Sequence, residues 1–324
     1  MEENTEQRVD LTLFSEKIQE LKDRIASVIV GQEQTVDLVL TAILANGHVL
    51  IEGVPGVAKT LLARLTARLI DADFSRVQFT PDLMPSDVLG TTVFNMKTNG
   101  FDFHQGPIFA DIVLVDEINR APAKTQAALF EVMEERQISI DGTTHRMGDL
   151  YTILATQNPV EQEGTYKLPE AQLDRFLMKI TMDYPSLEEE VNILERHHTN
   201  AALVKLDDIV PAITKEELLS LRAFMNQVFV DRTLLQYIAL IVQQTRTSKA
   251  VYLGASPRAS VAMLQSSKAY ALLQGRDFVT PEDIKFVAPY VLQHRLILTA
   301  EAEMEGYSPV KVTQRLIDKV EVPT

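Results

Sequence analysis

The spacing of apolar residues predicts helices and strands that alternate over the first half of the chain. Leu11–Val28 and a second segment ending near Ala45 carry apolar residues at helical spacing. Short apolar runs that glycine, proline or acidic residues interrupt predict buried strands. These runs are His48–Glu52, Asp111–Val115 and Leu150–Ala155. A helix from Lys59 to about Ile70 follows the first run, so the pattern predicts an α/β fold with a mainly parallel sheet and helices on both faces.

Two segments interrupt this rhythm and predict β-hairpins. Asn99-Gly100 lies between the apolar runs Thr91–Met96 and Phe101–Gln105, and Asn-Gly between such runs is a strong hairpin signal. Asp141-Gly142 separates Gln137–Ile140 from Thr143–Met147 in the same way. We expect both hairpins to be insertions into the α/β frame, as ordinary surface hairpins or as contacts for a substrate.

The pattern changes near residue 185, and helical periodicity dominates from there on. The predicted helices are Leu187–His197, Lys215–Val228, Thr233–Thr247, Pro257–Gln274 and Pro281–Ala300. The sequence therefore predicts two domains, an α/β domain over residues 10–185 and an all-helical domain over residues 186–324.

Composition and charge exclude several classes of protein. With 46% hydrophobic residues in 324, the chain can bury a core, and with no cysteine it has no disulfide, thiol nucleophile or cysteine-ligated metal. Residues 1–185 hold 16 basic and 28 acidic side chains, a net charge of −12, which disfavours binding to nucleic acid or anionic membranes. Because no apolar run approaches the length of a membrane span and the first ten residues are acidic, we expect a cytoplasmic protein without membrane insertion.

The segment GVPGVAKT, residues 53–60, lies between a predicted strand and a predicted helix. A glycine-rich turn there lets backbone N–H groups surround a polyphosphate at a helix N-terminus. Lys59 would reach the β- and γ-phosphates, and the Thr60 hydroxyl would bind Mg²⁺. Ala58 stands where the P-loop pattern has glycine, and its methyl group is tolerable if φ is negative. The alternative is a glycine-rich turn that binds nothing.

Two other strands end in polar side chains. Asp116 and Glu117 follow the apolar run 112–115, and Asn158 follows the strand ending near Ala155. The carboxyl ends of parallel strands meet at the edge where open α/β sheets bind ligands. Asp116 can hold Mg²⁺ through water, Glu117 can polarise an attacking water, and Asn158 can orient that water or contact the γ-phosphate.

The chain resembles the MoxR family of AAA+ ATPases. The motifs GVPGVAKT, VDEINRAP, ATQNP, LPEAQLDRF and GASPRA occur in the family's order between about residues 31 and 260, and alanine at position 58 is the family's habit. The resemblance implies a P-loop AAA+ core followed by a helical lid, with ATP and Mg²⁺ bound. It implies these roles: Lys59 and Thr60 in Walker A, Asp116 and Glu117 in Walker B, Asn158 as sensor 1, Arg175 as the arginine finger and Arg258 as sensor 2.

The resemblance also implies which residues hold the nucleotide. They are Val30 and Gly31 at the adenine, and Gly53, Val54, Pro55, Gly56, Val57, Ala58, Lys59, Thr60, Leu61 and Asp116 around the phosphates, with Thr60 and Asp116 at the metal. Arg175 lies at the far edge of the α/β domain, which suits an arginine that acts on a neighbouring subunit's nucleotide. The alternatives are a surface salt bridge with Asp174 or Glu170 for Arg175, and an exposed helix-start residue for Arg258.

Family members are ring-forming ATPases, commonly hexamers, that act as chaperones for proteins with von Willebrand factor A domains and in metal or cofactor insertion. The resemblance thus implies ATP hydrolysis that drives remodelling of a partner protein. Two alternatives are a nucleotide-dependent switch or scaffold with little turnover and a nucleic-acid motor. Glu117, Asn158 and Arg175 argue against the first, and the acidic α/β domain argues against the second.

Overall fold

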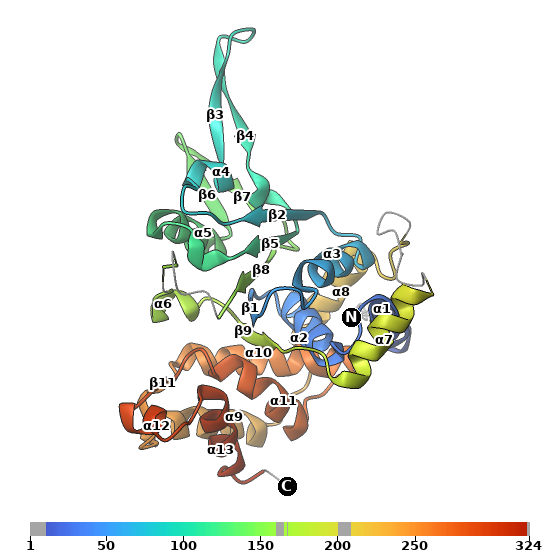
Figure 1. Ribbon diagram of the computed structural model, residues 1–324, viewed down its shortest axis with the longest axis vertical. Coiled ribbons are helices and arrows are strands. Elements are labelled where there is room, and N and C mark those ends of the chain that lie inside the picture. Colours follow the sequence, from blue (N-terminus) through green and yellow to red (C-terminus); the bar gives the residue numbers. More distant parts are fainter. Residues whose placement is uncertain (1–10, 160–164, 167, 200–208, 323–324) are drawn as a thin grey trace, which may run out of the picture.

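A parallel five-stranded sheet with strand order β2-β5-β8-β1-β9 organises the first half of the chain (Figure 1). The computed structural model describes residues 11–159, 165–166, 168–199 and 209–322. The strands are β1 (Val49–Gly53), β2 (Phe74–Gln78), β5 (Ile112–Asp116), β8 (Thr152–Gln157) and β9 (Met178–Met182). The predicted parallel sheet is confirmed, and the two outermost strands, β2 and β9, are additions that the apolar pattern did not predict.

Helices cover both faces of this sheet. They are α1 (Leu11–Val28), α2 (Glu33–Leu44), α3 (Lys59–Leu69) and α5 (Ala123–Glu135), with the short helices α4 (Pro85–Leu89) and α6 (Glu170–Leu173). Helices α1 to α3 share one core with Leu114 and Leu154, whereas α5 shares a second core with Val113 and Ile153. Successive residues of a strand point to opposite faces, so each central strand contributes to both cores.

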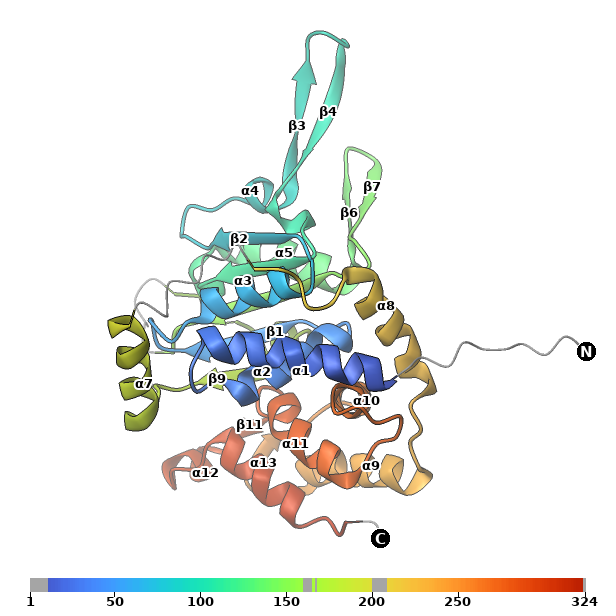
Figure 2. The ribbon, with the colours of Figure 1, turned by 90° about the vertical axis from the view of Figure 1, so that its right-hand side faces the viewer.

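Both predicted hairpins are present and project from the β2 side of the sheet (Figure 2). One pairs β3 (Gly90–Asn95) with β4 (Gly100–Gln105), and the other pairs β6 (Gln137–Ile140) with β7 (Thr143–Arg146). Asn99 and Asp141 both adopt a positive φ of 50°, the conformation that tight hairpin turns require.

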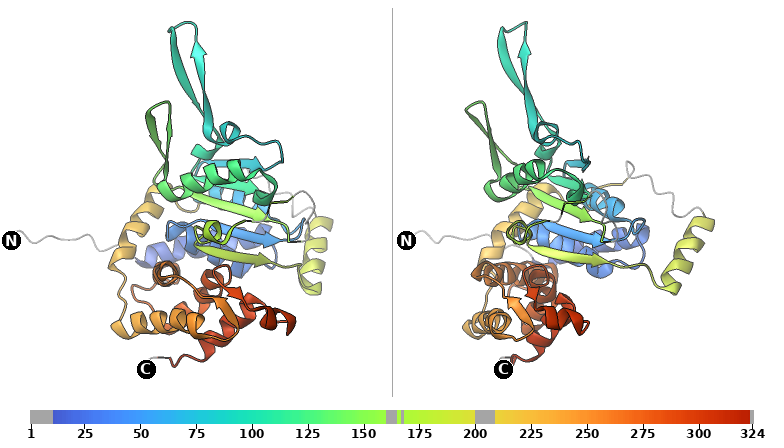
Figure 3. Two further views of the ribbon diagram at one scale, coloured as in Figure 1. Left: turned by 90° about the vertical axis from the view of Figure 1, so that its left-hand side faces the viewer. Right: turned by 60° about the vertical axis from the view of Figure 1, so that its left-hand side comes forward.

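The second half of the chain is mainly helical, as predicted. Its helices are α7 (Leu187–His198), α8 (Lys215–Phe224), α9 (Arg232–Thr247), α10 (Pro257–Leu273), α11 (Pro281–Leu292), α12 (Ala300–Met304) and α13 (Pro309–Asp318). This part also contains one short antiparallel strand pair, β10 (Val251–Leu253) with β11 (Ile297–Leu298), among its described residues. Helices α9 to α13 gather below the sheet, where α10 contacts α2, whereas α7 and α8 lie beside the α/β part (Figures 2 and 3). Among the described helices, none is long and apolar enough to cross a membrane.

The expectation of one helix from Pro281 to Ala300 is wrong. Helix α11 ends at Leu292, and the chain then enters β11 before α12 begins. The side chains of Gln293, His294 and Arg295 donate hydrogen bonds across to backbone carbonyls between Asp174 and Lys179. These long-range contacts fix a turn that helical periodicity cannot reveal.

A buried histidine, His48, is expected to make the stability of the fold depend on pH. The His48 ring lies directly before β1, where Nδ1 accepts a hydrogen bond from the Ile153 N–H at 3.0 Å and Nε2 lies 3.1 Å from the Met133 carbonyl oxygen. This pattern fits the neutral ring with its proton on Nε2. Burial, helped by the charge of Arg136, lowers the pKa of His48 from 6.5 to about 3.

Between about pH 3 and pH 6.5, the unfolded chain therefore binds a proton at His48 that the folded chain does not. We expect the free energy of unfolding to fall as the pH drops through this range. His48→Gln should reduce this slope by about 1.4 kcal/mol per pH unit. Urea unfolding at about pH 7 and about pH 5 measures the slope. The exposed His104 on β4 offers the control, since His104→Gln should leave the slope unchanged. A slope that His48→Gln does not alter contradicts the prediction.

Candidate functional site

A cavity of about 390 Å³ opens at the carboxyl ends of β1, β5 and β8. Its lining comprises Pro55, Gly56, Ala58, Lys59, Thr60, Leu61, Arg76, Gln78, Asp116, Glu117, Thr156 and Asn158. Strand β8 lies between β1 and β5, and all three run parallel, so their carboxyl ends deliver side chains to one place. The structure thus brings together nine of the residues that the sequence assigned to a nucleotide site.

The loop before α3 turns through two left-handed residues, Gly56 with φ of 89° and Ala58 with φ of 63°. The condition of a negative φ at Ala58 is therefore not met. An L-residue pays about 1–2 kcal/mol for this conformation, a strain that active-site loops commonly carry. The turn places Lys59 at the first position of α3 and directs the loop toward the cavity.

Lys59 is held inside the loop. Its Nζ donates to the carbonyl oxygens of Gly53 at 2.5 Å and Val54 at 2.9 Å. Burial lowers the pKa of Lys59, while the charges of Asp116 and Glu117 act in the opposite direction. A partly desolvated ammonium group beside a glycine-rich turn is suited to an anionic ligand.

Asp116, at the end of β5, is buried and has two partners. Its Oδ2 pairs with Arg76 Nε at 2.6 Å, and its Oδ1 accepts from the Thr156 hydroxyl at 3.0 Å. The same hydroxyl accepts from the Glu117 N–H at 3.0 Å, so Thr156 on β8 links the two carboxylate residues of β5. Arg76 was not predicted, because it lies on the unpredicted strand β2. Thr156 lies within the ATQNP motif but was not assigned a role from the sequence.

Glu117 takes a left-handed conformation, with φ of 57°, immediately after β5. Its Oε2 accepts from Gln78 Nε2 at 2.8 Å and pairs with Arg120 Nε at 2.9 Å. Gln78 lies two residues after Arg76 on the same unpredicted strand, so it was also missed. The two contacts fix the direction of a carboxylate that lines the cavity.

Asn158 directly follows β8, is 8% exposed and lines the same cavity. Val30 and Gly31 lie instead in the turn between α1 and α2, outside the cavity lining. There the carboxyl group of Glu189 from α7 approaches so closely that a Cβ built on Gly31 would lie 2.4 Å from it. The left-handed φ of 74° is what favours glycine at position 31, because the end of the flexible Glu189 side chain can move away from a Cβ.

Arg175 and Arg258 lie together at a second cavity, of about 330 Å³, and neither lines the first. Arg175 Nε lies 3.7 Å and Arg258 Nη2 lies 3.4 Å from the carboxylate of Glu134 on α5. Arg175 also donates to the Phe130 carbonyl. The Arg258 side chain is 68% exposed. The structure therefore places Arg175, the predicted arginine finger, and Arg258, the predicted sensor 2, outside the lining of the first cavity, here called the P-loop cavity.

Comparison with known proteins agrees with this architecture. The sequence pattern of the ATPase family associated with various cellular activities (AAA) matches residues 48–178, and that of the AAA lid domain matches residues 243–318. A crystal structure of a candidate ATPase from Cytophaga hutchinsonii superimposes with a TM-score of 0.89 at 40% identity, covering 97% of each chain.

Two relatives extend the match to most of the chain. Chaperone MoxR1 of Mycobacterium tuberculosis is 44% identical over 92% of this chain and 80% of its own length. Protein MoxR of Methylorubrum extorquens is 30% identical over 91% of both chains. Together with the P-loop cavity and the helical lid, these matches establish that the chain belongs to the MoxR family of AAA+ ATPases.

Proposed function

We propose that the protein hydrolyses ATP to ADP and phosphate in the cavity at the end of β1, β5 and β8. The observation that carries this proposal is the convergence of Lys59, Asp116, Glu117 and Asn158 on that one cavity. Lys59 binds the β- and γ-phosphates, Glu117 accepts a proton from the attacking water, and Asn158 orients that water.

The residues present also suit Mg²⁺. Thr60 supplies a hydroxyl oxygen and Asp116 a carboxylate within the same cavity, and Mg²⁺ prefers oxygen ligands shared with phosphates. No cluster of three or more histidine, cysteine, aspartate or glutamate side chains suited to a metal occurs in the part of the chain that the structure describes, so most other ligands would come from phosphate and water. Bound Mg²⁺ neutralises charge that develops on the phosphates.

We further propose that the protein forms a ring of six identical subunits and that each active site is shared between two neighbouring subunits. Arg175 and Arg258 both lie at Glu134, away from their own P-loop cavity, which supports a role on the nucleotide of a neighbouring subunit. In this arrangement both arginines stabilise charge on the γ-phosphate. From the sequence, Arg258 was expected to act as sensor 2 from the lid, so that ATP bridges the two domains of one chain. Its position at Glu134, outside the cavity lining, favours the nucleotide of a neighbouring subunit instead.

The work driven by hydrolysis is proposed to be chaperone-like remodelling or maturation of a partner protein. The name of the relative MoxR1 supports the chaperone role, and the family resemblance favours a partner with a von Willebrand factor A domain. The exposed hairpin β3–β4 carries a pair of phenylalanines, Phe94 and Phe101, whose rings are 5.3 Å apart and which could contact such a partner.

A mixing experiment tests the shared site. Lys59→Ala removes ATP binding but retains Arg175, whereas Arg175→Ala binds ATP but fails to act on its neighbour. Each variant alone should be inactive, because an arginine finger contributes about 10³–10⁵ to turnover. Mixed rings should recover roughly a quarter of wild-type activity if subunits assort randomly and interfaces act independently.

Differently tagged subunits that co-purify demonstrate that mixed rings form. Mixing Lys59→Ala with Glu117→Gln gives a matched control that should stay inactive. Both changes lie in the P-loop cavity of their own subunit, so no interface in these rings combines an intact Arg175 with a complete cavity. Co-purified mixed rings of Lys59→Ala and Arg175→Ala that remain inactive would show that Arg175 does not act between subunits.

A further inference from the structure

The segment that carries Arg175 is hydrogen-bonded to the lid, residues 243–318, by three consecutive side chains that follow α11. Gln293 Nε2 donates to the Lys179 carbonyl at 2.5 Å, and His294 Nε2 lies 3.0 Å from the Phe176 carbonyl. Arg295 makes the largest number of these contacts. All three side chains therefore bind the stretch that leads from Asp174 into β9.

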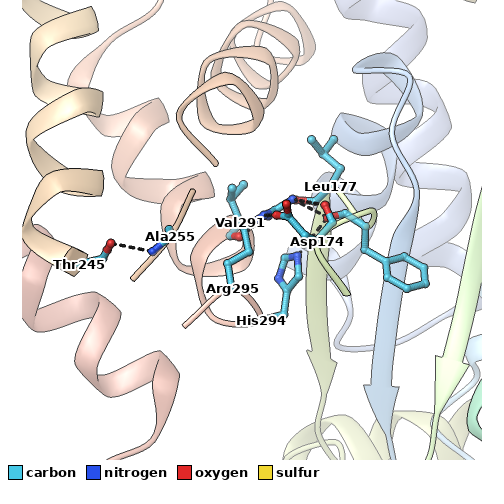
Figure 4. Close-up of polar contacts among 8 residues, drawn as sticks. Asp174, Leu177, Thr245, Ala255, Val291, His294 and Arg295 are labelled. Atoms are coloured by element: carbon cyan, nitrogen blue, oxygen red, sulfur yellow. Dashed lines mark hydrogen bonds and ion pairs between the residues drawn. The ribbon is translucent and has the colours of Figure 1, made fainter. Parts of the chain in front are cut away.

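Arg295 surrounds the residues on both sides of Arg175. Its Nε pairs with Asp174 Oδ1 at 2.6 Å. Its two terminal nitrogens donate to the carbonyl oxygens of Asp174 at 3.2 Å, Phe176 at 2.7 Å and Leu177 at 3.1 Å, and also to Val291 of α11 (Figure 4). The Arg295 side chain is only 5% exposed, so the planar guanidinium group is both fully bonded and buried.

Arg258 is fixed by the same domain through a different loop. The Ala255 N–H donates to the buried Thr245 hydroxyl at 3.0 Å (Figure 4). Arg246 Nε donates to the Ala255 carbonyl at 2.9 Å. A Cβ on Gly254 would lie 2.8 Å from backbone atoms of Thr245 and Arg246, so only glycine allows this approach. These contacts hold the start of α10, and with it Arg258, against α9.

We propose that Arg295 is a positioning residue for Arg175, and that through it the lid presents Arg175 and Arg258 to the neighbouring subunit's nucleotide as one rigid unit. The inference rests on the proposed function, because it assumes that the two arginines act between subunits. A movement of the lid would then move both arginines together, although Arg175 belongs to the α/β part of the chain.

Arg295→Lys tests this role, because lysine keeps the charge beside Asp174 but cannot span three carbonyl oxygens. We expect kcat for ATP hydrolysis to fall by about 10–100-fold, the effect of misplacing a catalytic group by about 1 Å. The KM for ATP should change little, since the P-loop cavity of the variant is intact. Arg276→Lys is the matched control: Arg276 also pairs with a buried lid carboxylate, Asp283, at 2.5 Å, but does not contact the Asp174–Leu177 segment.

Mixing separates positioning from general destabilisation. Arg295→Lys mixed with Lys59→Ala should recover activity above the mean of the two separate preparations, because Lys59→Ala subunits supply a correctly held Arg175. Arg295→Lys mixed with Arg175→Ala should recover none, because both are defective on the same side of the interface. If Arg295→Lys does not fold, Asp174→Asn, which weakens the same pair, enters the same two mixtures.

The outcomes distinguish this inference from the proposed function. If Arg175→Ala and Lys59→Ala complement each other but Arg295→Lys or Asp174→Asn keeps wild-type kcat, or fails to complement Lys59→Ala, the positioning role is wrong and the shared site stands. A loss of kcat in Arg276→Lys as large as that in Arg295→Lys also overturns the positioning role. If Arg175→Ala and Lys59→Ala do not complement in mixed rings, the shared site fails, and the inference fails with it.

Discussion

Lys59→Ala is expected to abolish ATP binding. Lys59 is the only cation in the loop of residues 53–60, and the carboxylates of Asp116 and Glu117 line the same cavity. Without the ammonium group, the phosphates meet these carboxylates and lose a charge-assisted hydrogen bond. We expect affinity measured by titration calorimetry to fall by about 100-fold or more.

Lys124→Ala provides the control for this change. Lys124 lies exposed on α5 of the same α/β part, so its removal alters the net charge equally without touching the cavity. It should bind ATP with wild-type affinity. Near-equal affinity of the Lys59→Ala variant and the wild type would remove Lys59 from the phosphate site.

Glu117→Gln should retain ATP binding and lose hydrolysis. The amide preserves the size of the side chain and still accepts the hydrogen bond from Gln78, which the carboxylate accepts at 2.8 Å, but it cannot take a proton from water. Loss of a general base typically costs about 10²–10⁴-fold in kcat. Phosphate release under saturating ATP measures the loss, and calorimetry in parallel verifies binding.

The exposed Glu131 on α5 supplies the matched change, since Glu131→Gln should leave turnover unaffected. Turnover by Glu117→Gln within a few-fold of the wild type would assign the base to another residue. If the prediction holds, Glu117→Gln keeps the protein in its ATP state. It is then suited to capturing the proposed client, and enrichment of proteins with von Willebrand factor A domains over a Lys59→Ala capture would support the proposed partner class.

Much of the nucleotide cavity was predictable because each motif is local. The loop of residues 53–60, Asp116 with Glu117, and Asn158 all follow apolar runs that form parallel strands. The geometry of a parallel sheet brings the ends of such strands to one edge, so the cavity can be derived without any long-range contact.

The polar residues on β2 escaped prediction for an equally physical reason. Its sequence FSRVQ buries only Val77, because β2 lies at the edge of the sheet. Without a continuous apolar run, nothing in the local pattern indicated a strand there. Arg76 and Gln78 could therefore be assigned to the site only from the tertiary structure. There β2 pairs with β5, and this pairing sets the two side chains beside Asp116 and Glu117.

The sequence by itself determined the α/β order, the two hairpins and the identity of the phosphate-binding loop, because periodicity and turn chemistry act over a few residues. Only the tertiary structure decided where Arg175 and Arg258 lie. Their placement depends on α10 packing against α2 and on Arg295 reaching Asp174, 121 residues earlier in the chain. Such contacts follow from how two domains fit together, so no local pattern of apolar and polar residues encodes them.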